Sequence, residues 1–303
     1  MTLRPTARAR SAPGRARVVA ITVALTVAAA VAGGVPAPAA ADTPRWQRLS
    51  PPPPMPAPAA EGVVTVGDAR LRWARHGAAD APPLVLLHGG MGSGDDFAAQ
   101  IPALAARFRV IVVDSRGHGR STRGRGGLGY HAMAEDLVAV LDHLGLARVA
   151  VLGWSDGGIV ALDLAIHHPA RVDRLVVTGV NTDKAGTRST AGSATFKAYF
   201  ARAVKEYRRL APDPRQLAAF RKDLRAMWKG QPAYTEAQLR TIAAPLLVLH
   251  GEHDELVRRD HAERLAAVVA RGTFVELPGV SHFAMWQDPD AFDRAALAFL
   301  TAP

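Results

Sequence analysis

The sequence predicts an α/β fold in which a mostly parallel, twisted sheet is flanked by helices on both faces. Short continuous apolar runs alternate along the chain with longer segments whose apolar residues recur at helical spacing. The apolar runs are bounded by Pro, Gly and Asp, as expected of strands that are buried on both faces. One stretch, residues 181–241, breaks this alternation and predicts an inserted helical cap, because it is too long to be a loop of a compact domain.

The predicted strands and helices follow one another in a regular order. Gly67-Asp68 predicts a hairpin between the first two strands, and further apolar runs supply the others. Helices are expected where apolar side chains recur every three or four residues. The strands are expected at 63–66, 71–74, 84–87, 110–113, 149–152, 175–178, 246–249 and 274–277, and the helices near 137–144, 159–166, 262–269 and 292–300.

The predicted cap is rich in aromatic residues. Seven of the eighteen aromatic residues of the chain lie in residues 181–240, including Phe200 and Trp228. Two interpretations are open: the rings line an apolar acyl pocket, or they pack the cap onto the core. The helical spacing that predicts the cap is seen in Phe196, Tyr199/Phe200, Ala203/Val204 and Tyr207, and again in Leu217, Phe220 and Leu224.

Residues 1–41 have the features of a secretory signal peptide. Five arginines precede an uncharged apolar run from Val18 to Ala32, and Ala39-Ala40-Ala41 offers a cleavage site before Asp42. The alternative is a membrane anchor, but about 15 apolar residues are fewer than the roughly 20 that a spanning helix needs. We therefore expect a secreted protein with no stable membrane anchor after cleavage.

The mature chain is expected to fold as one large domain. Residues 42–61 are rich in Pro and predict an extended linker, and residues 62–180 and 242–303 form the predicted core around the cap. Loss of the five arginines lowers the formal charge from +10 to +5, and the remaining basic residues are scattered, which does not favour nucleic acid as a partner. There are no cysteines, so stability must come from the core rather than from disulfides.

The pentapeptide Gly153-Trp154-Ser155-Asp156-Gly157 is a G-x-S-x-G motif that follows a predicted buried strand and opens a predicted helix. In this context the serine occupies a tight turn that exposes its Oγ at the end of the sheet, and flanking glycines avoid clashes. The helix adds the positive end of its dipole. Ser155 is therefore the candidate nucleophile.

A serine hydroxyl needs a base within hydrogen-bond reach, and the base needs an orienting acid. In the strand–helix context of this motif the partners follow in the order Ser, acid, His, each in the loop after a strand. The loops after the last two predicted strands supply Asp254 as the acid and His282 as the base. Glu252 and Glu255 in the same loop, and Asp183 after an earlier strand, are competing candidates for the acid.

Acyl transfer also needs donors for the oxyanion. The run His88-Gly89-Gly90-Met91-Gly92 follows a predicted strand, and its glycines leave backbone N–H groups accessible. We expect the N–H of Gly90 to be the first donor, with that of Met91 as the near alternative, and the N–H of Asp156 to be the second. A simple glycine turn is the competing interpretation.

Five segments of the chain together resemble the α/β-hydrolase superfamily, specifically its single-domain capped esterase and lactonase branch, over roughly residues 62–301. The resemblance implies an α/β-hydrolase fold and a hydrolase without a cofactor that acts on esters, lactones, thioesters or related small acyl compounds. It also implies that Asp114 to Ser121 shape a loop and do no chemistry. The five segments are His88-Gly89-Gly90, Asp114 to Ser121, the G-x-S-x-G motif, Gly251-Glu252-His253-Asp254 and Ser281-His282-Phe283.

Two departures from related enzymes narrow the function. Met91 stands where family peptidases that release N-terminal proline usually have Pro, and Ser155 stands where haloalkane dehalogenases and epoxide hydrolases have Asp. Two alternatives stay open: a cofactor-free haloperoxidase or perhydrolase that uses the same triad, and a ligand-binding protein that has kept the fold. The sequence does not indicate the oligomeric state.

Neither a metal nor a nucleotide cofactor is expected from the sequence. His250-Gly251-Glu252-His253 has the composition of a metal site but lacks the H-E-x-x-H spacing, and it lies in the predicted acid loop. The glycines between positions 117 and 127 do not form a dinucleotide fingerprint. His167-His168 is predicted to end a helix, where imidazoles commonly interact with carbonyl groups.

Overall fold

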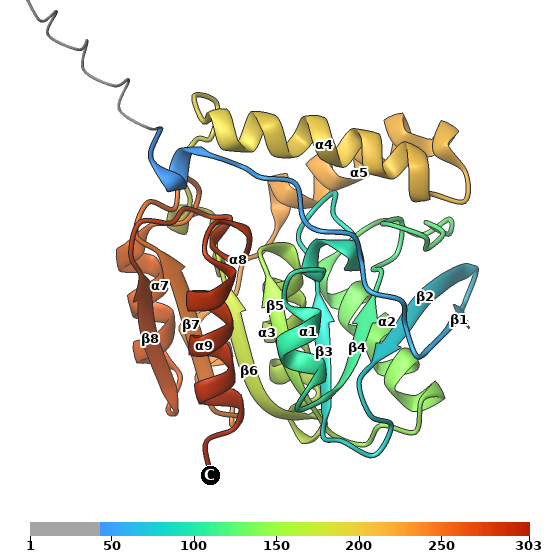
Figure 1. The fold of residues 1–303 in the computed structure, drawn as a ribbon, viewed down its shortest axis with the longest axis horizontal. Coiled ribbons are helices and arrows are strands. Elements are labelled where there is room, and N and C mark those ends of the chain that lie inside the picture. Colours follow the sequence, from blue (N-terminus) through green and yellow to red (C-terminus); the bar gives the residue numbers. More distant parts are fainter. Residues whose placement is uncertain (1–42) are drawn as a thin grey trace, which may run out of the picture. The chain divides into compact units, whose positions relative to one another are not determined.

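The computed structural model describes residues 43–303. These residues fold around one eight-stranded sheet (Figure 1). The predicted signal peptide, residues 1–41, lies outside the described residues. The strand order is β1-β2-β4-β3-β5-β6-β7-β8; β1/β2 and β2/β4 are antiparallel and the remaining pairs are parallel. The strands are β1 (Ala60–Val66), β2 (Ala69–His76), β3 (Pro83–Leu87), β4 (Arg109–Val113), β5 (Val149–Trp154), β6 (Val172–Thr178), β7 (Leu246–Gly251) and β8 (Gly272–Leu277).

Helices cover both faces of the sheet, so the fold class predicted from the sequence is confirmed. α1 and α9 contact each other on one face, and α2 and α3 contact each other on the opposite face (Figure 1). No helix within residues 43–303 is both long enough and apolar enough to cross a membrane. The helices are α1 (Ile101–Ala105), α2 (Tyr130–His143), α3 (Asp156–His167), α4 (Ala194–Leu210), α5 (Leu217–Gly230), α6 (Glu236–Leu239), α7 (Arg259–Val268), α8 (Ala284–Gln287) and α9 (Pro289–Leu300).

The middle of the sheet forms the core. Every residue of β5 and of β7 is buried, whereas most of β8, at the edge, is only half-buried. Because β3 to β8 are parallel, their carboxyl ends meet at one edge of the sheet, and the loops that follow β5, β7 and β8 lie there together.

The cap is inserted between β6 and β7 and consists mainly of α4 and α5, which lie over this edge of the sheet (Figure 1). The side chain of Ser193 caps α4 by accepting the N–H of Phe196. Its buried face contains Phe196, Tyr199, Ala203 and Tyr207, which is the spacing that predicted the helix.

The segment 43–59, predicted as part of a Pro-rich linker, lies against the body of the protein. It makes a short 3-10 turn, η1 (Arg45–Gln47), and then runs extended along α4 to β1 (Figure 1). Arg45 Nη1 lies 2.6 Å from a carboxylate oxygen of Asp288, and Gln287 Nε2 donates to the carbonyl oxygen of Trp46 at 2.9 Å. Arg202 of α4 donates to the carbonyl oxygen of Ser50. The segment therefore touches both the cap and the loop that carries His282.

Candidate active site

The turn between β5 and α3 consists of a single residue. β5 ends at Trp154 and α3 begins at Asp156, so Ser155 alone reverses the chain, with φ 54° and ψ −122°. Residues with a side chain rarely adopt a positive φ, which makes this a strained position. The next turn packs so tightly against β3 that a Cβ on Gly157 would lie 2.1 Å from the carbonyl oxygen of Leu87. The spacing of the motif thus reflects a steric requirement for glycine beside the serine.

The structure brings the three residues predicted as a triad together at the carboxyl edge of the sheet. His282 Nε2 lies 3.1 Å from Ser155 Oγ, and His282 Nδ1 lies 3.0 Å from Asp254 Oδ2. Asp254 Oδ1 also accepts the backbone N–H groups of Leu256 at 2.9 Å and Val257 at 2.8 Å, which fixes the carboxylate. These distances are those that a serine, a general base and an orienting acid require.

The competing acids do not bond the imidazole of His282. Glu255 accepts the backbone N–H of His282 at 3.2 Å through Oε2, while its other oxygen binds the side chains at the start of α4. Glu252 accepts the N–H of Gly279 at 2.8 Å, and Asp183 caps the short 3-10 turn that follows it. Within residues 43–303, Asp254 is therefore the carboxylate that bonds the imidazole of His282.

The charges of the triad support one another. Burial disfavours charge on His282, but the carboxylate of Asp254, helped by Glu255 and Asp156, raises the pKa of His282 above its ordinary value. Burial acts to raise the pKa of Asp254 as well, yet the charge and hydrogen bond of His282 lower it overall. Asp254 therefore stays ionised at neutral pH, where its charge can stabilise a protonated imidazole at His282.

The predicted oxyanion donors border the same space as the serine. Gly90, Ser155 and Asp156 all line one cavity, and no acceptor within residues 43–303 is bonded to the backbone N–H of Gly90 or of Asp156. The carbonyl oxygen of Gly90 accepts the hydroxyl of Tyr199 at 2.7 Å, which fixes the loop. Met91 has φ 66°, a conformation that the ring of proline forbids, so its difference from the family peptidases is also a difference in backbone geometry.

The cavity above Ser155 has a volume of ≈ 350 Å³ and lies between the core and the cap. Its aromatic wall comes largely from α4 and α5 and includes Phe196, Phe200 and Trp228. Other cap aromatics face the core instead: Phe220 is fully buried and stacks on Tyr207. The two interpretations of the cap aromatics therefore apply to different residues of the same helices.

A buried carboxylate beside the serine connects the cap to the core. Asp156 Oδ1 accepts the hydroxyl of Tyr130 at 2.8 Å, and Oδ2 accepts the indole N–H of Trp228 at 2.8 Å. Burial raises the pKa of Asp156, although these two hydrogen bonds lower it in part. α2, α3 and α5 thus meet at one side chain on the wall of the cavity.

Several residues that support the site were not predicted from the sequence. The indole N–H of Trp154 donates to the carbonyl oxygen of His282 at 3.0 Å and so joins the serine turn to the histidine loop. Tyr130 and the backbone contact of Glu255 to His282 were also missed. Trp154 stands inside the recognised motif and could have been suspected, whereas nothing local in the sequence indicates the partners of Tyr130 or Glu255.

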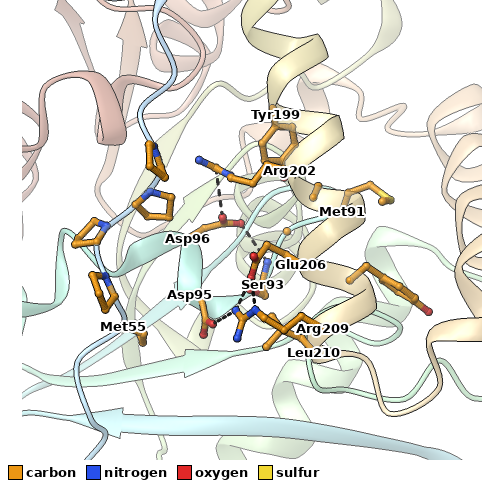
Figure 2. Close-up of a pocket in the computed structure, with 18 residues that line it drawn as sticks. Met55, Met91, Ser93, Asp95, Asp96, Tyr199, Arg202, Glu206, Arg209 and Leu210 are labelled. Carbon is orange, nitrogen blue, oxygen red and sulfur yellow. Dashed lines mark hydrogen bonds and ion pairs between the residues drawn. The ribbon is translucent and has the colours of Figure 1, made fainter.

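A second cavity, of ≈ 370 Å³, lies between the N-terminal segment and α4 (Figure 2). Arg202 points toward Asp96 there, at a distance of 3.8 Å, and burial raises the pKa of Asp96 to about 7 although Arg202 lowers it in part. None of the described residues that line this cavity belongs to the triad. Tyr199 borders both cavities, and Ser155 and His282 line the one above Ser155.

The side chains of the His250–His253 segment mostly contact different partners, although His253 Nε2 lies 3.8 Å from Glu252 Oε2. His250 is buried beside Phe274, and His253 packs against the ring of Trp46. Glu252 holds the N–H of Gly279. They do not form a cluster of metal-ligating atoms in the described part of the chain.

Comparison with known proteins supports one family. The family model described as alpha/beta hydrolase fold matches residues 82–209. The chain is 32% identical over 252 residues to carbamate hydrolase RutD of Caulobacter sp. (strain K31), an alignment that covers 74% of this chain and 92% of that protein. It is 50% identical over 107 residues to the magnesium-chelatase 30 kDa subunit of Rhodobacter capsulatus, covering 35% of this chain and 36% of that relative, so it spans about a third of that protein.

Solved structures agree with the sequence relatives. Est816, described as an N-acyl homoserine lactone degrading enzyme, superposes with a TM-score of 0.64 at 26% identity. The superposition covers 78% of this chain and all of that one, at 100%.

Proposed function

The chain belongs to the alpha/beta hydrolase fold family and is a hydrolase acting on esters or amides, and from this premise we propose that it cleaves carboxylic esters or lactones through an acyl-enzyme on Ser155. The observation that carries the proposal is the hydrogen-bonded chain from Ser155 through His282 to Asp254. It lies at the floor of a cavity bordered by Gly90 and Asp156, whose backbone N–H groups have no acceptor within residues 43–303. Charge, burial and distance all favour serine chemistry at this point.

In the first half of the reaction, Ser155 Oγ attacks the acyl carbonyl carbon while His282 Nε2 takes the hydroxyl proton. The N–H groups of Gly90 and Asp156 bind the oxyanion, each contributing about 3 kcal/mol by comparison with measured oxyanion donors. When the bond to the leaving oxygen breaks, His282 passes its proton to that oxygen and the alcohol departs. In a lactone, the released alcohol stays attached to the acyl group.

In the second half, a water molecule attacks the acyl carbon of the ester formed with Ser155. His282 takes a proton from the water and returns it to Ser155 Oγ as the acyl–oxygen bond breaks, which releases the acid. Asp254 keeps the imidazole oriented in both halves through the bond to Nδ1. Every proton that moves is accounted for by His282, so no cofactor is needed.

A carbamate is the second candidate substrate class, favoured by the 32% identity to the relative named as a carbamate hydrolase. The same attack on a carbonyl carbon would apply. The aromatic wall formed by Phe196, Phe200 and Trp228 instead favours an apolar acyl chain, because apolar rings reward apolar contact area.

A substrate screen tests the proposal. Purified protein is assayed with p-nitrophenyl esters of rising chain length, with lactones and with aryl carbamates, each beside Ser155→Ala. We expect turnover of esters or lactones that the variant lacks. Turnover of carbamates alone would replace the first substrate class with the second. A protein that binds acyl compounds but shows neither turnover nor a fluorophosphonate label at Ser155 would support the ligand-binding alternative.

We also propose that the protein is exported, on the basis of the arginines, apolar run and alanine-rich site within residues 1–41. N-terminal sequencing of the protein from culture fluid should give a chain that begins at or near Asp42. Recovery of the chain with residues 1–41 attached, in the membrane fraction or inside the cell, would overturn this proposal without affecting the chemistry.

A further inference from the structure

A cluster of metal-ligating side chains lies outside the candidate active site, where α2 begins and α3 ends. His131 Nδ1 lies 2.8 Å from Asp163 Oδ1, and His167 Nδ1 lies 3.0 Å from the same oxygen. Asp163 and His167 are four residues apart on α3, so they share one face of the helix. One ligand atom from each of the three residues falls within 4.8 Å of the other two.

The surroundings of the cluster differ from those of a solvated surface ion pair. The side chain of Asp163 is only 4% exposed, whereas those of His131 and His167 are 59% and 37% exposed. The second oxygen of Asp163 accepts the hydroxyl of Tyr234 at 2.8 Å, and the carboxylate of Glu135 lies 3.8 Å from the far ring nitrogen of His131. An outer hydrogen bond such as that from Tyr234 is typical of residues that bind metals, because it orients the ligating carboxylate.

We propose that His131, Asp163 and His167 bind a divalent transition metal ion, with Zn²⁺ as the reference ion. Two imidazole nitrogens and one carboxylate oxygen suit Zn²⁺ and its neighbours, whereas Ca²⁺ and Mg²⁺ prefer oxygen ligands throughout. Ligand atoms around tetrahedral zinc lie about 3.3 Å apart, given bonds of roughly 2.0 Å. The nitrogen–oxygen distances in the cluster are close to this value, and the exposed side leaves room for water as a further ligand.

The position of the cluster assigns the ion a structural role. Asp163 lies eight residues after Ser155 on α3, about 12 Å along the helix, so the ion does not reach the reacting atoms. Tyr234 lies in the segment 231–235, which follows α5. In the same segment, the side chain of Gln231 accepts the backbone N–H of Tyr130 at 3.1 Å. Binding would therefore hold the segment 231–235 and the start of α2 against α3, next to the candidate pocket.

No local motif in the sequence indicates this site, because its residues are far apart along the chain. His131 and Asp163 are 32 residues apart and belong to different helices. The interaction expected for His167, a bond to a helix carbonyl, is also present, since its Nδ1 lies 3.0 Å from the carbonyl oxygen of Asp163. Nδ1 of His167 can either donate a proton to this carbonyl or bind a metal, and a binding experiment distinguishes the two.

The test uses the whole protein, stripped of metal with a chelator and then titrated with Zn²⁺ in a calorimeter and in thermal melts. We expect saturable binding of one ion per chain and a rise in Tm, because an ion that binds only the folded state stabilises it. His131→Gln and His167→Gln should each weaken binding at least tenfold, and Tyr234→Phe by about tenfold. Titration with Co²⁺ should give visible absorption bands that the two histidine variants lack.

His168→Gln is the matched control, because His168 is adjacent in sequence but bonds Glu135 at 2.6 Å instead of joining the cluster. It should bind Zn²⁺ like the unaltered protein. The proposal is overturned if the unaltered protein shows no saturable binding, or if His131→Gln and His167→Gln bind as tightly as it does. Loss of binding in His168→Gln alone would move the site to His168 and Glu135. Circular dichroism without metal shows whether each variant is folded, and fluorophosphonate labelling of Ser155 tests the proposed function separately.

Discussion

Ser155 occupies a backbone conformation that alanine tolerates no better and no worse than serine does. Its φ of 54° is imposed by the junction of β5 and α3, and Oγ makes its one described hydrogen bond with His282. Ser155→Ala should therefore abolish turnover and fluorophosphonate labelling while leaving the thermal transition nearly unchanged. Activity assays, mass spectrometry of the labelled protein and a thermal melt provide the measurements. Labelling that survives the substitution would identify another nucleophile.

Asp254 and Asp183 offer a matched pair of substitutions. Asp254→Asn removes the charge that orients His282 and should lower kcat by on the order of 10³–10⁴-fold. Asp183→Asn alters only the N-cap residue of the short 3-10 turn Lys184–Gly186, so its effect on kcat should be mild. The reverse ranking would move the orienting acid to the earlier loop. Circular dichroism of both variants controls for folding.

The pH profile gives a second reading of the same pair. His282 accepts a proton only when it is neutral, and its pKa lies above the ordinary value of 6.5 because of Asp254. Activity of the unaltered protein should therefore fall as the pH drops through a value above 6.5. In Asp254→Asn the burial remains without its countercharge, so the acid limb of kcat/KM should move to lower pH. A limb that stays in place would mean that Asp254 does not set the pKa of His282.

At the scale of the helices, the cap divides between lining the pocket and packing. Phe200 is 36% exposed and lines the cavity above Ser155, whereas Phe220 is fully buried against Tyr207 and His118. Phe200→Ala should change the preference between short and long esters by about 1–3 kcal/mol with little change in Tm. Phe220→Ala should cost about 3–5 kcal/mol of stability and affect all substrates alike. kcat/KM for two esters and a thermal melt separate the cases.

A uniform loss of activity with a lowered Tm in Phe200→Ala would contradict this division. The cap would then act as a lid whose rings only hold it in place. Because both residues are phenylalanines of the cap, the comparison keeps the chemistry of the substitution constant and changes only the position.

At the scale of the molecule, one buried acid predicts how stability depends on pH. Burial and the nearby Asp290 raise the pKa of Asp293 in α9 to about 7, from 3.8. A folded pKa above the unfolded one means that the native state binds more protons, so the free energy of unfolding decreases as the pH rises between about 4 and 7. Asp293→Asn should raise stability at pH 8 by on the order of 2 kcal/mol, allowing for partial solvent screening, and change it little at pH 4.

Denaturant melts at the two pH values measure this effect. An Asp293→Asn variant that is equally stabilised at both would indicate that packing rather than charge is responsible. Asp290→Asn serves as the control, because it removes the neighbouring charge and should give a smaller gain in the same direction.

The strands of the sheet could be predicted from the sequence because each has a recognisable local pattern. Runs such as Leu84–Leu87 and Leu246–Leu249 are apolar throughout and bounded by breakers, so each overlaps an observed strand. The short helices α1 and α8 were not predicted, because four or five residues contain too little periodicity to recognise. The order of the strands was also beyond reach, since pairing joins segments far apart in the chain.

The candidate site shows the same limit at finer scale. Ser155, Asp254 and His282 could be named because each occupies a set place relative to a strand, and the structure brings them within hydrogen-bond distance. The bonds of Asp156 to Tyr130 and Trp228 depend on how the cap settles on the core. No local pattern describes that packing, so these partners emerge only from the fold.

The position of the N-terminal segment has a consequence for the order in which the chain closes. The carbonyl oxygens of Ser50 and Trp46 accept hydrogen bonds from Arg202 and Gln287. These partners are 152 and 241 residues further along the chain. The ribosome makes this segment before the cap and the histidine loop, so these two contacts cannot form until both partners exist. The docking of residues 43–50 therefore cannot precede the formation of the cap and the histidine loop, and we expect these residues to be open to proteases until then. Pulsed proteolysis during refolding would follow this step, since protease resistance in the segment would report the time at which it docks.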